Sequence, residues 1–310
     1  MTSATSFAGP APIVPRRARL EAGRITLETG EDLSEALADG CLRLRIPPEV
    51  DLGPGLALAR NFWREPDGGP ADAYRGFRRA SDIYFDREHF QTEHLLLDRP
   101  QRLRHLPADV VGLCDALAAI GRDVLAAVLS RLDVPREVRD RAVVGCLHGR
   151  AVEWMAVSHY RPERRQLGCP PHKDTGYVTV LYFDQEGLEA RRDGAWRRID
   201  PEPGYFLVNF GGALELLTRR LERPVEALLH RVAERRPDPG AEDRFSFAAF
   251  VNPAASGMLC ELDGRRIPQP VQSVEDFLRS FNEETWRDSY ADFGIVDPHD
   301  ARPDDGGVRR

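Results

Sequence analysis

The chain has 310 residues, of which 42% are hydrophobic and 30% charged, which is the balance of a soluble globular protein with a sizeable core. The formal net charge is −7, no block of basic residues is interleaved with aromatic ones, and no apolar run approaches the roughly 20 residues that cross a bilayer. These features exclude membrane insertion and argue against nucleic acid as a partner. We expect a small-molecule partner instead, and the composition does not specify an oligomeric state.

The cysteines and the chain ends indicate a cytosolic protein with one folded domain. The five cysteines are odd in number, widely spaced and contain no Cys-x-x-Cys pair, a pattern unlike a disulfide framework or a zinc site and typical of a reducing cytosol. They are Cys41, Cys114, Cys146, Cys169 and Cys260. Residues 1–15 are rich in Ala, Pro, Ser and Thr without the features of a signal peptide. We therefore expect a disordered tail over 1–17, a single domain over 18–296 and a polar tail over 297–310.

In chain order, the domain begins with short strands and a helix. Alternation of apolar and polar residues predicts strands over 24–27 and 41–46, and Pro47-Pro48 ends the second strand. A helix is expected over 56–63.

The next part of the chain contains an irregular stretch and a long helix. The Gly-, Pro- and charge-rich stretch 66–106 predicts a long irregular segment, either wrapped around a site or inserted at the surface. Apolar residues at three- and four-residue steps predict one helix over 109–132, and Pro135 opens a further helical turn through Arg141.

The second half of the chain has a β-rich pattern. From 153 to 253, short β-rich runs alternate with turn sequences such as Asp193-Gly194, which is typical of a sandwich or jelly roll rather than of a parallel α/β sheet. No Gly-x-Gly-x-x-Gly or Walker-type loop is present, which argues against a nucleotide cofactor. A last helix is expected from Ser273 to Tyr290. We expect it to cover the mouth of the β core together with part of 66–106 or, alternatively, to buttress the outer sheet.

A His-x-Asp element lies just before the strand-like run 177–183. Residues two apart in an extended segment point to the same face, so His172 and Asp174 present an imidazole and a carboxylate together, while Lys173 points away. We expect Lys173 to face solvent or a loop or, alternatively, to contact an acidic substrate. A second imidazole would complete the 2-His-1-carboxylate set that holds Fe(II) and leaves coordination positions open. The alternative is a strand-end histidine beside a turn aspartate. Cys169, three residues earlier, is expected to be a small buried or loop thiol.

Two further elements offer the groups that such a site needs. His230 lies in an apolar, strand-compatible run 58 residues after His172, and it is either the third metal ligand or a hydrogen-bonded core histidine. In the run RFSFAAFVNP, the period of two places Arg244 and Ser246 on one face. A buried arginine needs a counterion, because an unpaired buried charge is costly. A carboxylate held by the Arg244 guanidinium, with a hydrogen bond from Ser246, would meet that need.

In this order, the segments HKDTGYVTVLYF, LLHRV and RFSFAAFVNP resemble the isopenicillin N synthase-like group of Fe(II)/2-oxoglutarate-dependent oxygenases over about 150–253. The resemblance implies a mainly β fold with a double-stranded β-helix (jelly-roll) core and an N-terminal helical region. The implied Fe(II) ligands are His172, Asp174 and His230. The implied 2-oxoglutarate residues are Arg244, Ser246 and Tyr160. The last of these matches the tyrosine of the family's Asn-x-Tyr element, in which Ser158 replaces the usual asparagine.

The same resemblance implies an activity. A small metabolite would be hydroxylated, desaturated or cyclised with O₂, while 2-oxoglutarate is converted to succinate and CO₂. Lys173 is the only lysine among 43 basic residues, and this arginine bias suggests a GC-rich genome. Together with the family resemblance, it favours a role in bacterial specialised metabolism such as antibiotic biosynthesis. Two alternatives stay open. One is an isopenicillin N synthase-type Fe(II) oxidase that uses no 2-oxoglutarate, and the other is a jelly-roll binding protein without turnover.

Overall fold

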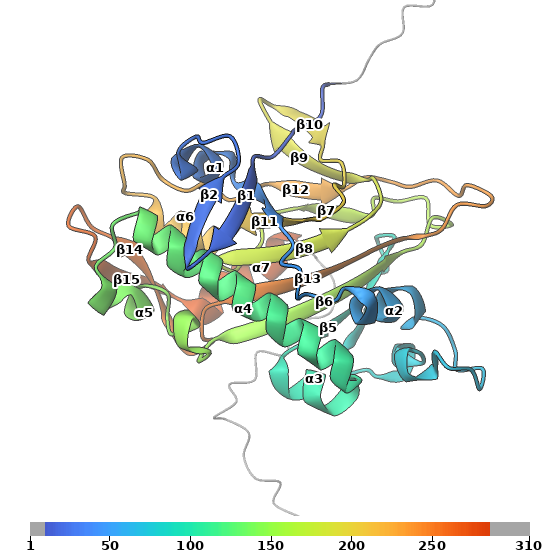
Figure 1. Ribbon diagram of the computed structural model, residues 1–310. Coiled ribbons are helices and arrows are strands. Elements are labelled where there is room, and N and C mark those ends of the chain that lie inside the picture. Colours follow the sequence, from blue (N-terminus) through green and yellow to red (C-terminus); the bar gives the residue numbers. More distant parts are fainter. Residues whose placement is uncertain (1–9, 286–310) are drawn as a thin grey trace, which may run out of the picture.

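Two β-sheets face each other in the computed structural model of the protein, which describes residues 10–285 except for the side chains of 282–285 (Figure 1). The strands of the larger sheet are β1 (Arg17–Glu21), β2 (Arg24–Leu27), β3 (Cys41–Arg45), β4 (Tyr84–Asp86), β5 (Thr92–Leu97), β6 (Val152–Tyr160), β8 (Val178–Phe183), β11 (Tyr205–Phe210) and β13 (Arg244–Asn252). Those of the smaller sheet are β7 (Cys169–His172), β9 (Leu188–Arg192), β10 (Ala195–Arg198) and β12 (His230–Val232). A separate hairpin consists of β14 (Met258–Leu262) and β15 (Pro268–Ser273).

The described chain also contains helices and short 3₁₀ turns. The α-helices are α1 (Leu33–Asp39), α2 (Gly53–Asn61), α3 (Arg99–His105), α4 (Ala108–Arg131), α5 (Arg139–Ala142), α6 (Gly212–Thr218) and α7 (Val274–Thr285). Short 3₁₀ turns are η1 (Asp72–Tyr74), η2 (Phe77–Arg79), η3 (Arg136–Val138) and η4 (Cys146–His148). Among the described residues, no helix is both long and apolar enough to cross a lipid bilayer.

The order of the strands brings distant parts of the sequence together. Within the described chain, the larger sheet runs β2-β1-β3-β11-β8-β13-β6-β5-β4 and the smaller runs β10-β9-β12-β7. The central strand β13 pairs with β6 on one side and β8 on the other, both antiparallel. The expected mainly β fold with flanking helices is confirmed, and the described strands form two facing sheets rather than one closed barrel.

The long helix expected over 109–132 is confirmed as α4, which crosses the outer face of the larger sheet (Figure 1). Its apolar stripe packs against β8 and β13. The buried members of the stripe include Val110, Leu113, Leu117, Ile120, Val124 and Val128. Because this helix seals one face of β8 and β13, the other face of both strands is left to line the space between the sheets. The strands expected over 24–27 and 41–46 are likewise present as β2 and β3.

The stretch 66–106 is more regular than expected. It contains β4, β5 and α3, and β5 pairs along its whole length with β6, so the expectation of one long irregular segment is wrong for 84–105. The helix α3 begins with a capping box, in which Asp98 Oδ1 accepts from the Gln101 backbone N–H at 2.8 Å and the Gln101 side chain accepts from that of Asp98 at 3.0 Å. The pairing of β5 depends on a strand about 60 residues away, which local composition does not reveal.

The start of the structured chain differs from the boundary expected at residue 18. Strand β1 begins at Arg17, and the backbone N–H of Ile13 donates to the carbonyl oxygen of Arg198 at 2.8 Å. The structured chain therefore starts before the expected boundary at residue 18. The expected tail over 297–310 and residues 1–9 lie outside the described residues.

Candidate active site

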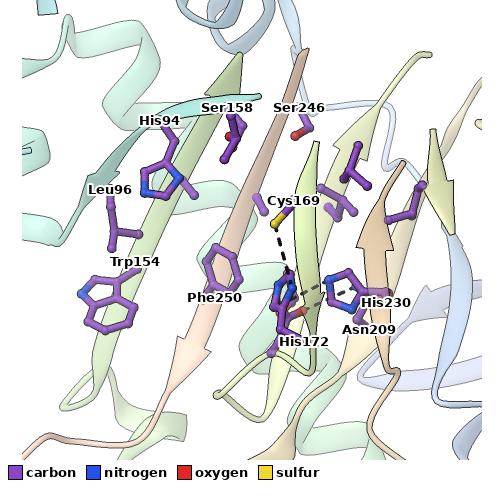
Figure 2. A pocket seen from close by; sticks show the side chains of 18 of the residues that line it. His94, Leu96, Trp154, Ser158, Cys169, His172, Asn209, His230, Ser246 and Phe250 are labelled. Carbon is purple, nitrogen blue, oxygen red and sulfur yellow. Dashed lines mark hydrogen bonds and ion pairs between the residues drawn. The ribbon is translucent and has the colours of Figure 1, made fainter. Parts of the chain in front are cut away.

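A cavity of about 150 Å³ lies between the two sheets (Figure 2). Strands β5, β6, β8, β11 and β13 of the larger sheet line it from one side, and β7, β9 and β12 of the smaller sheet line it from the other. All six site residues predicted from the sequence lie in its wall: Tyr160, His172, Asp174, His230, Arg244 and Ser246. Of these six, Tyr160 and Ser246 are 86 residues apart in the chain and yet meet in one space.

Three of these side chains form a cluster with the composition of a metal site. Strand β12 pairs with β7 so that His230 lies directly opposite His172, and the two ring centres are 4.3 Å apart. Asp174 Oδ1 lies 3.7 Å from His172 Nε2 and 3.8 Å from His230 Nε2. One ligand atom from each residue lies within 4.8 Å of the others. This donor set is the 2-His-1-carboxylate arrangement that suits Fe(II).

Backbone carbonyls fix which nitrogen of each ring faces the cluster. His172 Nδ1 lies 2.9 Å from the carbonyl oxygen of Pro170, and His230 Nδ1 lies 2.9 Å from that of Leu228. A carbonyl only accepts, so each Nδ1 carries the proton and donates it, and each Nε2 keeps a lone pair directed at the cluster. A metal-ligating histidine needs this support for its other nitrogen. The two rings are therefore oriented for a metal in advance.

The start of α6 positions the carboxylate. The backbone N–H of Gly212 donates to the carbonyl oxygen of Asp174 at 2.7 Å. A Cβ at Gly211 would collide with the carbonyl oxygen of Gly176 and lie 2.8 Å from that of Asp174, so only glycine permits this approach. Asn209 adds a hydrogen bond of 3.5 Å from its side-chain amide to Asp174 Oδ2.

Arg244 lies in the same cavity wall and is 1% exposed. Its Nε donates to the carbonyl oxygen of Glu186 at 3.2 Å, and its guanidinium carbon lies 4.5 Å from the ring centre of Tyr160. Among the described residues, no acidic side chain forms an ion pair with Arg244, and its buried Nη1 has no hydrogen-bond partner. Ser246 lies two residues on, its Oγ 3.5 Å from the hydroxyl of Tyr160. The three side chains form a site with a free donor and a positive charge, which suits a carboxylate.

Two neighbours of the cluster lie as the sequence suggested. Lys173 is absent from the cavity wall and donates to both carboxylate oxygens of Glu215, at 2.9 and 2.7 Å. Cys169 is buried in the wall, with its Sγ 4.0 Å from His172 Nδ1.

Part of the expected covering helix reaches the cavity. Helix α7 starts after Ser273, whose Oγ accepts from the backbone N–H of Asp276 at 3.0 Å, so the helix begins where the sequence predicted. Phe281 lines the cavity, and its ring centre lies 6.2 Å from that of His172. The last residues of the expected helix, 286–290, lie outside the described residues.

Sequence reasoning missed several residues of the wall. His94 and Leu96 come from β5, which was not expected to be a strand, and Trp154 and Phe250 come from β6 and β13. Alternation along a recognised strand could have found the last two, because they share a face with Tyr160 and Arg244 respectively.

The sequence around the cavity matches a known family. Residues 152–253 match the model of the 2OG-Fe(II) oxygenase superfamily. These residues belong to that superfamily. The resemblance based on the three sequence segments is thereby confirmed at the superfamily level.

Two curated relatives are named as a dioxygenase and as an oxoglutarate-dependent demethylase. The chain is 35% identical over 160 residues to mugineic-acid 3-dioxygenase of Hordeum vulgare, covering 50% of this chain and 43% of the relative. It is 27% identical over 209 residues to oxoglutarate-dependent flavonoid 7-O-demethylase 1 of Ocimum basilicum, covering 63% of this chain and 54% of the relative. The chain thus spans about half the length of these curated relatives.

Solved structures of other proteins share the fold. The rice dioxygenase for auxin oxidation aligns over 90% of this chain and 99% of its own, with a TM-score of 0.64 and 21% identity. JOX2 in complex with 2OG, Fe and JA aligns over 90% of both chains, with a TM-score of 0.61 and 18% identity. The expected jelly-roll core is confirmed by these neighbours.

Proposed function

We propose that the protein is a non-haem Fe(II)- and 2-oxoglutarate-dependent oxygenase that oxidises a small molecule with O₂. The observation that carries the proposal is the presence, in one cavity, of the 2-His-1-carboxylate cluster and of the buried Arg244, whose Nη1 has no partner among the described residues. The cluster is suited to bind a metal, and the guanidinium of Arg244 is suited to bind a carboxylate.

Each residue has a role in this proposal. His172, Asp174 and His230 hold the metal, with the lone pairs of both Nε2 atoms already directed at it. Arg244 and Ser246 bind and orient the distal carboxylate of 2-oxoglutarate, and Tyr160 packs against the guanidinium. When bound, iron and 2-oxoglutarate supply the oxidising chemistry, with release of succinate and CO₂. The surrounding apolar wall excludes water from the reacting groups.

The small-molecule substrate is part of the proposal. The names of the relatives refer to mugineic acid and to a flavonoid, and that of one structure to JA, which supports a substrate of this size. The further proposal of a role in bacterial specialised metabolism is supported by the arginine bias alone, since the relatives named here are from plants.

The test is anaerobic addition of 2-oxoglutarate to the Fe(II)-loaded protein. We expect a visible metal-to-ligand charge-transfer band, and with O₂ and a substrate we expect one succinate for each substrate oxidised. Consumption of O₂ with a substrate but without 2-oxoglutarate, and with no such band, would instead support the oxidase. Binding of neither Fe(II) nor 2-oxoglutarate would support a non-catalytic jelly-roll protein.

A further inference from the structure

One wall of the cavity has no role in the proposed binding of the metal or of 2-oxoglutarate. In Figure 2, Trp154, Leu96 and His94 lie on the side of the cavity away from His172 and His230, with Phe250 between the two groups. Three elements supply this wall: β5, β6 and β13. Ala156 and Phe281 also line the cavity. The wall therefore consists of rings and aliphatic groups with one imidazole, and it faces the space in which a substrate would meet the metal.

The charges that line the cavity are few. Among the described lining residues, Arg244 is the single arginine or lysine and Asp174 the single carboxylate. In the proposed function, two positive charges of the metal and one of Arg244 are balanced by one negative charge of Asp174 and two of 2-oxoglutarate. No charge is left over for a substrate. A charged group entering this low-dielectric space would be buried without a counterion, which is costly.

The imidazole in the wall adds no charge. His94 is buried, and its Nε2 lies 3.3 Å from the Nη2 of Arg87. Arginine only donates, so Nε2 accepts and the ring is neutral, with its proton on Nδ1. Burial, with a smaller contribution from the charge of Arg87, holds the pKa of His94 well below its usual value of 6.5. Arg87 itself is not part of the cavity wall.

We propose that the part of the substrate that enters the cavity is uncharged and carries a planar ring, which packs against Trp154 and Phe250. This inference rests on the proposed function, because the charge balance includes the metal and 2-oxoglutarate. Aromatic side chains favour flat ring partners in stacked or edge-on contact. The cavity of about 150 Å³ must also hold 2-oxoglutarate, so only the reacting end of a larger substrate fits inside.

The test uses three fragments of the same shape and different charge: benzamide, benzoate and benzylammonium. Their binding is measured by saturation-transfer NMR in the Zn(II) protein saturated with 2-oxoglutarate, in which no turnover occurs. We expect the dissociation constant of benzamide to be lower by at least about tenfold than those of the two ions, because only the ions are desolvated without a partner. Equal or tighter binding of benzoate or benzylammonium, or no binding of benzamide, would overturn the proposal.

Variants of the wall residues test whether benzamide binds at this wall. Trp154→Leu is expected to weaken the binding of benzamide by about tenfold, because the ring contact is lost. The matched control is Trp196→Leu, on β10 and outside the cavity wall, which is expected to leave the affinity for benzamide unchanged. Leu96→Arg adds a cation to the wall and is expected to reverse the preference toward benzoate. Benzamide affinity that is unchanged in Trp154→Leu would overturn the proposal even if Leu96→Arg does not fold. The charge-transfer band of the Fe(II) protein is recorded first, so that failure of 2-oxoglutarate binding is distinguished from failure of the fragment test.

Discussion

Arg244 is buried without a counterion among the described residues, so its replacement is expected to affect stability and binding in opposite directions. An unsatisfied buried polar group costs about 1–3 kcal/mol, and more when it is charged. Arg244→Met keeps the apolar stem against Tyr160 and Phe183 and removes the charge. The free energy of unfolding of the protein without 2-oxoglutarate should therefore rise by about 1–3 kcal/mol. In a domain of this size each kcal/mol corresponds to about 2 °C of melting temperature.

The same substitution removes the main donor for the carboxylate of 2-oxoglutarate. Truncating one partner of a buried charge pair costs about 2–5 kcal/mol, which is about 30-fold to several thousandfold in the dissociation constant. The assay combines an anaerobic titration of the charge-transfer band with thermal melts in the presence and absence of 2-oxoglutarate. At 100 times its dissociation constant, 2-oxoglutarate should stabilise the wild-type protein by about 2.7 kcal/mol and the variant much less.

A matched control is Arg231→Met. Arg231 lies on the same small sheet as His230 but pairs with Glu189 at 2.7 Å outside the cavity wall, so its loss should leave 2-oxoglutarate affinity unchanged. The reasoning is refuted if Arg244→Met lowers the melting temperature of the ligand-free protein and keeps the full shift with 2-oxoglutarate.

Three further predictions concern the metal, the carboxylate support and pH. His230→Ala should lose stoichiometric Fe(II), measured by metal analysis, while far-UV circular dichroism stays unchanged; undiminished iron would contradict the ligand assignment. Gly211→Ala should displace the backbone of Asp174 and weaken metal binding at least about tenfold, and wild-type affinity would show that the close approach is unimportant. Burial alone would raise the pKa of Glu93, but hydrogen bonds, first from His159, outweigh it and hold the pKa at about 2, below the usual 4.5. The stability contributed by ionised Glu93 is thus present above about pH 4.5 and lost as the pH falls toward 2, so Glu93→Gln should show a flatter acid-unfolding curve in that window.

Local patterns were sufficient for the groups that share one strand. The alternation rule placed Arg244 and Ser246 on one face, and the structure has both in the cavity wall. The same rule correctly directed Lys173 away from the cavity. These predictions succeeded because the side-chain period of a strand is a property of the backbone and needs no knowledge of its partners.

Such local patterns do not predict which strands pair or in which register. The register that sets His230 opposite His172 joins segments 58 residues apart, and β5 becomes a strand because it pairs with β6. His94 and Leu96 were missed for that reason. Their role in the cavity follows from tertiary pairing, which overrides a composition that favours irregular structure.

The short strand β12 holds the small sheet together at its centre. It has three residues, lies between β9 and β7, and its pairing with β7 shifts register between His230 and Val232. So few backbone hydrogen bonds give little protection against local opening. An ion bound by both His172 and His230 would cross-link β12 to β7, so amide exchange in 230–232 should slow markedly on metal loading. Exchange in β13, which is paired on both sides within the larger sheet, should stay the same.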